Sequence, residues 1–183
     1  MTTATTDQLV PHGTWAVDTI HSNANFEVEH AGLSIFRGGF RPVGAKLVAG
    51  EEGIALEGSV SVDSVTIEDE NLRPHLLSPD FFDVERNPEI AYRSTAISGP
   101  ADDLRVVGEL TMAGASLPVE GRGRLRGPVA GPGGVERLAL SLEAAVDRTE
   151  YGMNWQMELP AGGQALANEV KLIVALEFVR AEG

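Results

Sequence analysis

The most constraining feature of this chain is an alternation of apolar and polar residues with a period of two. In HSNANFEVEH, residues 21–30, one parity is apolar up to its last member and the other is polar: Ala24, Phe26, Val28 and His30 against Asn25, Glu27 and Glu29. Successive side chains of a strand point to opposite faces, so this stretch is typical of a strand with one buried and one wet face. Such strands belong to antiparallel sheets.

The same alternation returns along the rest of the chain, in IALEGSVSVD, LRVVGELTM, LPVEGRGRLRG, VERLALSLEAAVD and EVKLIVALEFVR. Turn signals rich in glycine and proline separate these stretches, such as GPVAGPGG at residues 127–134. Roughly eight strand candidates lie at hairpin spacing, and no long apolar helix is present to cover a flat sheet. Because closure removes exposed edges, we predict an all-β, extended eight-stranded antiparallel β-barrel.

The interior of such a barrel is either filled by side chains or holds one small apolar ligand. The inward positions mix large apolar residues with small ones, among them Gly58, Gly108, Gly121, Gly123 and either Ala139 or Ala144. Small inward residues leave room, but glycines also bend barrel strands. The alternation therefore leaves a cavity and a packed core as equal alternatives.

One segment, RPHLLSPDFFDVERNPEI at residues 73–90, breaks the alternation. Ser78 and Pro79 stand in the order of a helix N-cap and a first-turn proline. We predict short helical turns that cross one end of the barrel, and we call residues 73–90 the lid segment. Its apolar residues either plug the interior or complete the core as a simple loop: Leu76, Leu77, Phe81 and Phe82.

The net charge of −13 argues against binding to nucleic acid or to anionic membrane surfaces, because an acidic surface repels phosphates. The absence of cysteine excludes disulfides, thiolate metal sites and a cysteine nucleophile. Residues 1–12 carry neither a basic nor an apolar signal region, and no apolar run is long enough to span a membrane. We expect a cytoplasmic protein with a flexible leader at residues 1–12 and one barrel domain at residues 13–183.

The histidines raise the question of a metal site. On one uninterrupted strand, the odd offset between His21 and His30 places their side chains on opposite faces, so a site formed with His75 would need a bulge. We therefore expect no metal. The parity of His30 directs it inward, either as a hydrogen-bonded core histidine or as a contact for a ligand's polar head. Ser22 lies next to His21, but the pair does not form a nucleophile motif. Glu27 and Glu29 face the wet side, which argues against a paired acid–base role for the two carboxylates.

A second polar cluster occurs in DRTEYGMNW, residues 147–155. Arg148 is a candidate to hold a polar or anionic head group, with Tyr151 and Trp155 lining the mouth of a cavity. The alternative is that Arg148 pairs with a neighbouring acid and the two aromatic residues cap the core.

Several stretches together resemble the YceI-like, or polyisoprenoid-binding, family. These are WAVDTIHSNANFEVEH, the run from SVSVDSV through HLLSPDFFDVERNPEI, VVGELTMAGASLPVEG and DRTEYGMNW, in the family's order over almost the whole chain. The resemblance implies a lipocalin-like barrel with a long apolar tunnel that holds an isoprenoid chain, and it favours the cavity over the packed core. Two departures are the absence of a signal peptide and the sequence Leu72-Arg73-Pro74, where many members carry an aspartate.

Three functions follow as hypotheses. The first is a non-catalytic carrier for an isoprenoid, an isoprenoid quinone or a similar lipid, without a cofactor and compatible with a homodimer. The second is an enzyme of the cyclase or isomerase type with His30 or His75 as proton donor or acceptor, and the third is a filled structural barrel. We favour the first, and the residues expected at the ligand are Phe26, Val28, His30, His75, Leu76, Phe81, Phe82, Arg148, Tyr151 and Trp155.

Overall fold

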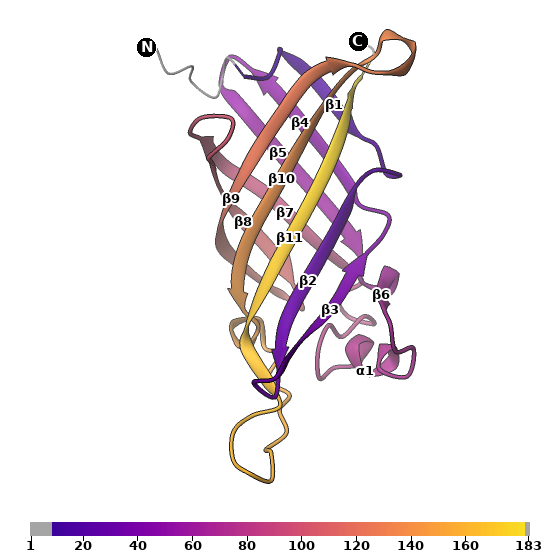
Figure 1. Ribbon diagram of the computed structural model, residues 1–183, viewed down its shortest axis with the longest axis vertical. Coiled ribbons are helices and arrows are strands. Elements are labelled where there is room, and N and C mark those ends of the chain that lie inside the picture. The colour runs from indigo at the N-terminus through magenta and orange to yellow at the C-terminus, as the bar shows by residue number, and fades with distance from the viewer. Residues whose placement is uncertain (1–8, 182–183) are drawn as a thin grey trace.

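The computed structural model describes residues 9–181, which form one antiparallel sheet closed into a barrel (Figure 1). The strands are β1 (Gly13–Val17), β2 (Asn23–His30), β3 (Ser34–Phe40), β4 (Gly44–Gly50), β5 (Gly53–Ser61), β6 (Val65–Ile67), β7 (Glu89–Ser98), β8 (Leu104–Met112), β9 (Ala115–Ala130), β10 (Glu136–Asp147) and β11 (Leu166–Arg180). The helical elements are α1 (Arg73–Leu77) and the 3₁₀ turns η2 (Val62–Ser64), η3 (Pro132–Gly134) and η4 (Arg148–Tyr151).

The ring is closed by β1, which pairs with β4 on one side and with β11 on the other. The closed order is β1-β4-β5-β7-β8-β9-β10-β11, and every pair of neighbours is antiparallel. The predicted eight-stranded antiparallel barrel is therefore confirmed.

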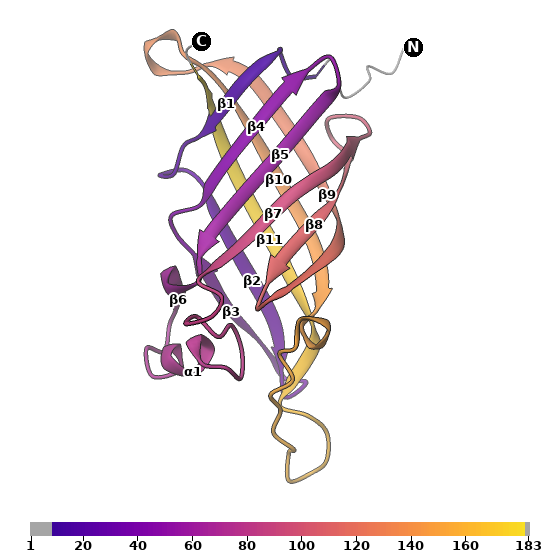
Figure 2. The same cartoon turned by 180° about the vertical axis from the view of Figure 1, so that it is seen from behind.

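Strand β11 is long enough to hold two partners along one edge. Its end near Arg180 pairs with β1, whereas the stretch from Leu166 to Ala175 pairs with β2. Strands β3 and β6 continue the sheet beyond β2, which lengthens the barrel at the end where α1 lies (Figures 1 and 2). Strand β6 pairs only with β3 among the described strands, and the lid segment follows at this edge of the sheet.

One half of the barrel is filled by large side chains. Trp15 and Phe178 are completely buried, and they sit on β1 and β11 where the ring closes. Leu47 of β4 is buried in the same core, and the alternation that predicted other strands places further residues there: Leu104, Leu138 and Leu140. This end of the molecule is a packed core of the ordinary kind.

Several inward glycines accommodate a bulky neighbour rather than create space. A Cβ atom on Gly38 would lie 2.4 Å from the ring of Phe26, its partner across the β2–β3 pair. A Cβ on Gly108 would lie 2.4 Å from the hydroxyl of Tyr92, and one on Gly123 would lie 2.5 Å from Leu142. These glycines allow large side chains to lie flat against the barrel wall.

The lid segment contains one helix, and it precedes Ser78 instead of following it. Helix α1 begins at Arg73 with Pro74 in its first turn, and Ser78 is its C-cap in an extended conformation. The Ser78 hydroxyl donates to the carbonyl of His75 at 2.7 Å. The prediction of Ser78 as an N-cap was therefore wrong, because Pro74 and Pro79 are both compatible with a first turn and the helix uses Pro74.

Phe81 and Phe82 are buried in the barrel core after the helix has ended. The ring of Phe82 packs edge-on against Phe40 of β3 at 5.6 Å between centroids. Backbone N–H groups of Phe82 and Val84 donate to the carbonyls of Leu76 and Leu77, which folds the segment back on α1. The lid segment thus completes the core with its aromatic rings while it crosses the barrel end.

The packed structure begins before the predicted domain boundary. Val10 is buried in the core, and the indole N–H of Trp15 donates to the carbonyl of Pro11 at 3.2 Å. The part of the expected leader that is described is therefore packed, and residues 1–8 lie outside the described residues. Within residues 9–181, no helix has both the length and the apolar character to cross a membrane.

The glycine packing gives a direct stability test. Gly38→Ala should lower the free energy of unfolding by about 1–3 kcal/mol, because the added methyl group overlaps the Phe26 ring. Gly50→Ala is the matched control on β4, since a Cβ there meets nothing within 4 Å. Urea unfolding of both variants measures the difference, and equal stability of the two would show that Phe26 moves aside freely.

Candidate functional site

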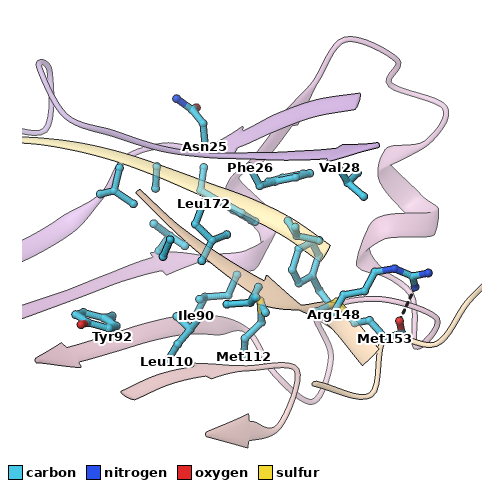
Figure 3. Close-up of a pocket in the computed structure, with 18 of the residues that line it drawn as sticks. Asn25, Phe26, Val28, Ile90, Tyr92, Leu110, Met112, Arg148, Met153 and Leu172 are labelled. Carbon is cyan, nitrogen blue, oxygen red and sulfur yellow. Dashed lines mark hydrogen bonds between the residues drawn. The ribbon is translucent and has the colours of Figure 1, made fainter. Parts of the chain in front are cut away.

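The other half of the barrel encloses a cavity of about 360 Å³. Its walls are almost entirely apolar and come from β2, β3, β4, β5, β7, β8, β9, β10 and β11, from the lid segment and from residues 152–165, which we call the mouth loop. In Figure 3, Tyr92 and Arg148 lie at opposite ends of the view, with Ile90, Leu110 and Met112 between them. The alternation of residues left open whether the barrel is packed or holds a cavity. The structure shows both: one half of the barrel is packed and the other is hollow.

Small inward residues create the room in this half. Ala24, Gly58, Gly121 and Ala144 all line the cavity, and they come from four different strands. A Cβ on Gly58 would have no atom closer than 3.5 Å. Of the small positions noted in the sequence, Gly58, Gly121 and Ala144 thus contribute space, whereas Gly108 and Gly123 accommodate neighbouring side chains.

The cavity reaches the surface between the lid segment and the mouth loop. Leu72 and Met157 both line it and are both exposed. His30 also lines the cavity and is exposed at the end of β2. We call this opening the mouth, and it lies at the α1 end of the barrel, away from the packed core (Figure 1).

Nine of the ten residues predicted at the ligand line this cavity. They are Phe26, Val28, His30, His75, Leu76, Phe81, Phe82, Arg148 and Trp155. Tyr151 does not line it; this side chain is buried in the core, and its hydroxyl has no hydrogen-bond partner among the described residues. Contact of these residues with a ligand stays a prediction.

His30 lies on the predicted strand but is exposed, so of the two alternatives left open for it the buried core histidine is wrong. It is the last residue of β2 and pairs with Leu166 of β11 and Ser34 of β3. Alternation directs its side chain to the cavity, but the strand ends there and the barrel opens. His30 is therefore a mouth residue.

His75 belongs to an aromatic cluster that joins the lid segment to the mouth loop. Its ring stands edge-on to Phe81 and Trp155, with centroid distances of 5.0 and 4.9 Å. The Nε2 atom lies 3.1 Å from Oδ2 of Asp80. The packing orients His75 at the mouth, where the apolar wall of the cavity meets a polar exterior.

His21 lies in a separate ion-pair cluster with Asp18, Arg137 and Glu177. Its Nδ1 lies 3.0 Å from Asp18 Oδ2, and Arg137 donates to Asp18 at 2.8 Å and to Glu177 at 2.6 Å. Within residues 9–181, the carboxylates and His21 are the one group close enough to share a metal ion. The guanidinium of Arg137 already supplies a cation between the two carboxylates.

Arg148 is buried, and its partners are three backbone carbonyls and the side-chain oxygen of Asn168 instead of the acid that was one expectation. Its guanidinium donates to the carbonyls of Met153 (2.5 Å), Trp155 (2.9 Å) and Ala167 (2.9 Å), and Figure 3 shows the bond to Met153. Burial lowers the pKa of Arg148. These bonds tie the mouth loop to β11, so Arg148 shapes the mouth through the backbone.

Tyr92 is a cavity residue that the sequence reasoning missed. Its side chain points into the cavity from β7 (Figure 3), its hydroxyl makes no hydrogen bond within the described residues, and burial raises its pKa to about 12. The segment EIAYRST alternates as the other strands do, and reading its parity would have placed Ile90 and Tyr92 inward. Tyr92 is a polar contact available away from the mouth.

The anchoring role of Arg148 can be tested by substitution. Arg148→Met should lower the free energy of unfolding by about 2–4 kcal/mol, because three carbonyls lose a charged donor in a buried setting. It should also speed cleavage of the mouth loop by chymotrypsin at Trp155. Arg122→Met is the control, since that exposed side chain is 3.7 Å from Asp103, and a similar loss there would contradict the anchoring role.

The Asp18 cluster predicts a pH dependence of stability. Hydrogen bonds from Arg137 and His21 lower the pKa of Asp18, so its contribution is present above its ordinary value of 3.8 and is lost as the pH falls through the lowered pKa. The Asp18 carboxylate raises the pKa of His21, so that contribution is present below its ordinary value of 6.5 and is lost as the pH rises through the raised pKa.

In the Asp18→Asn variant, both effects should disappear and the pKa of His21 should return towards its ordinary value. NMR titration of the His21 ring measures this directly, and thermal unfolding between acid and neutral pH follows the stability. Glu29→Gln, an exposed acid elsewhere, should leave the His21 titration unchanged. An unaltered His21 midpoint in Asp18→Asn would rule out Asp18 as the cause.

Several solved structures have a similar fold. BcnA of Burkholderia cenocepacia superposes with a TM-score of 0.73 at 19% identity, covering 88% of this chain and 98% of that one. A polyisoprenoid binding domain from Saccharophagus degradans gives a TM-score of 0.66 at 9% identity, covering 91% of this chain and 98% of that one. At these identities the likeness concerns the fold.

Curated sequences agree with the structural match. The protein YceI of Escherichia coli is 26% identical over 163 residues, which cover 87% of this chain and 82% of that protein. The YceI protein of Salmonella arizonae is 25% identical over the same shares. A model of the YceI-like domain matches residues 15–178, from β1 to β11, and the chain therefore belongs to the YceI-like family.

Proposed function

We propose that this protein binds one long apolar molecule, an isoprenoid chain or a similar lipid, inside the hollow half of its barrel. The observation that carries the proposal is the cavity of about 360 Å³, lined by apolar side chains and open at one end. This volume lies in the range of about 300–1,000 Å³ usual for small-molecule sites. The structural neighbour described as a polyisoprenoid binding domain supports the same ligand class.

The hydrophobic effect supplies the affinity. Each methylene group moved from water into the cavity contributes about 0.8 kcal/mol, so even a partly buried chain gains several kcal/mol. The cavity walls offer few polar side chains: Asn25, Ser59 and Tyr92 on the strands, Arg148 after β10, and His30 and His75 at the mouth. We therefore place the tail inside and a polar head group, where the ligand has one, beside the two histidines.

A carrier agrees better with this arrangement than an enzyme of the cyclase or isomerase type. Catalysis in the cavity would need His30 or His75 to reach a reacting bond as proton donor or acceptor. Both histidines lie at the mouth, whereas the deep part of the cavity is lined by residues such as Ile90, Leu110 and Leu172. The Nε and Nη1 groups of Arg148 are engaged by backbone carbonyls, and Nη2 donates to the side chain of Asn168.

Organic extraction of the freshly purified protein, followed by mass spectrometry, tests the proposal. We expect a long-chain isoprenoid or lipid in stoichiometric amount. Protein purified without ligand should take up an isoprenoid quinone, as measured by quenching of tryptophan fluorescence, because Trp155 lies at the mouth. A ligand-free extract combined with no uptake of any long-chain lipid would overturn the proposal.

Two neighbouring alanines on β10 provide a matched pair of variants. Ala144→Phe should reduce ligand uptake at least about ten-fold, because the ring fills the cavity at its small-residue wall. Ala145→Phe adds the same ring on the outer face of the same strand, where the residue is exposed, and should bind as the unmodified protein does. Equal uptake by the two variants would place the ligand outside the cavity.

A further inference from the structure

Apolar side chains gather on the outside of the mouth. The largest exposed fractions here belong to Leu33 at 88% and Met157 at 52%, and Leu72 and Ile35 are each 42% exposed. Leu33 lies in the turn between β2 and β3, Met157 in the mouth loop and Leu72 just before α1. These three segments lie at the same end of the barrel in both views (Figures 1 and 2).

The three segments are joined by direct contacts, so the segments that carry the four side chains meet around the mouth. The N–H of Ala31 donates to the carbonyl of Ala165 at 2.8 Å, which connects the β2–β3 turn to the mouth loop. The ring of Trp155 packs on His75 and on Phe81, at 4.9 and 5.7 Å, which connects the mouth loop to the lid segment. We call the side chains of Leu33, Ile35, Leu72 and Met157 the mouth rim.

The mouth rim is continuous with the cavity. Leu72 and Met157 contribute to the cavity wall and to the outer surface at once. A molecule sliding past them would stay in contact with apolar groups from outside the protein to the interior. Exposed apolar side chains that surround a ligand entrance in this way need a partner that is itself apolar.

The charges near the rim determine what kind of apolar surface fits. Glu29, Glu68, Asp69, Glu70 and Glu158 are all exposed on the segments that carry or adjoin the rim. Neither the β2–β3 turn nor the mouth loop contains a lysine or an arginine. The arginines beside Ile35 and Leu72, Arg37 and Arg73, are paired with Glu27 and Asp63. Anionic lipid headgroups attract basic clusters and repel acidic ones, so this rim suits a bilayer without net negative charge.

We propose that the mouth rim docks on a lipid bilayer of neutral, zwitterionic headgroups, where Leu33 and Met157 insert at the interface. This inference rests on the proposed function, since docking would let the ligand pass between the bilayer and the cavity without crossing water. Insertion of a few exposed apolar side chains gives reversible binding, as in other proteins that lie on a membrane surface.

Flotation with vesicles of pure phosphatidylcholine tests the docking on ligand-free protein. The double variant Leu33→Ser/Met157→Ser should bind these vesicles roughly ten-fold more weakly than the unmodified protein. The matched control is Val129→Ser/Val135→Ser, which removes two side chains that are 62% and 41% exposed at the β9–β10 turn, the other end of the barrel. The control should bind as the unmodified protein does, and phosphatidylglycerol in the vesicles should weaken binding.

Each opposite outcome overturns the docking. These outcomes are no flotation of the unmodified protein, equal loss in both double variants, and binding that requires cationic lipid but ignores the rim. Sedimentation velocity of the same proteins covers a further case. If the unmodified protein is a dimer, the rim variant is a monomer and neither binds vesicles, the rim is an interface with a second copy of the chain and the docking is overturned.

The docking and the proposed function can fail separately. Extraction and mass spectrometry measure ligand content without vesicles, and flotation measures docking without ligand. Bound lipid together with no flotation would overturn the docking and leave the carrier function standing. Flotation of a protein that never takes up a lipid would do the reverse.

Discussion

The structure depends on the hydrogen-bonded closure of the ring through β11. This strand pairs with β10 along one edge and shares the other edge between β1 and β2. Where β1 closes the ring, Trp15 and Phe178 fill the interior; where β2 takes over, the sheet continues into β3 and β6 and the interior is hollow. Closure thus provides a rigid, packed base on which an open cavity can be held without exposed strand edges in the ring.

The alternation of residues was sufficient to predict the barrel because a period of two assigns each side chain to a face. Phe26, Val28 and Leu110 are inward as expected. The hollow could not be read in the same way, because a small inward residue has two uses. Gly58 leaves space, whereas Gly108 lies under the ring of Tyr92, and the difference depends on which side chain lies across the strand pair.

The errors at the site have similar causes. Parity gives the direction of His30 but not the position of the strand end, so its exposure was missed. Two prolines in the lid segment are each compatible with a helix start, and only the tertiary packing of Phe81 and Phe82 distinguishes them. Two of the partners of Arg148 are backbone carbonyls of the mouth loop, which has no repeating pattern. The identity of a residue does not show whether its carbonyl accepts such a bond.

The small residues on the cavity wall show that the diameter of the barrel and the width of its cavity are different properties. Backbone pairing determines the diameter of the barrel. The width of the cavity inside it depends on small residues on the wall: Ala24, Gly58, Gly121 and Ala144. Exchange of one such residue for a larger one narrows the cavity and leaves every strand pair in register. Barrels of the same outline can therefore differ in the width of the molecule that fits inside. In such a barrel, the width of the cavity, and not the arrangement of the strands, determines which molecule fits inside.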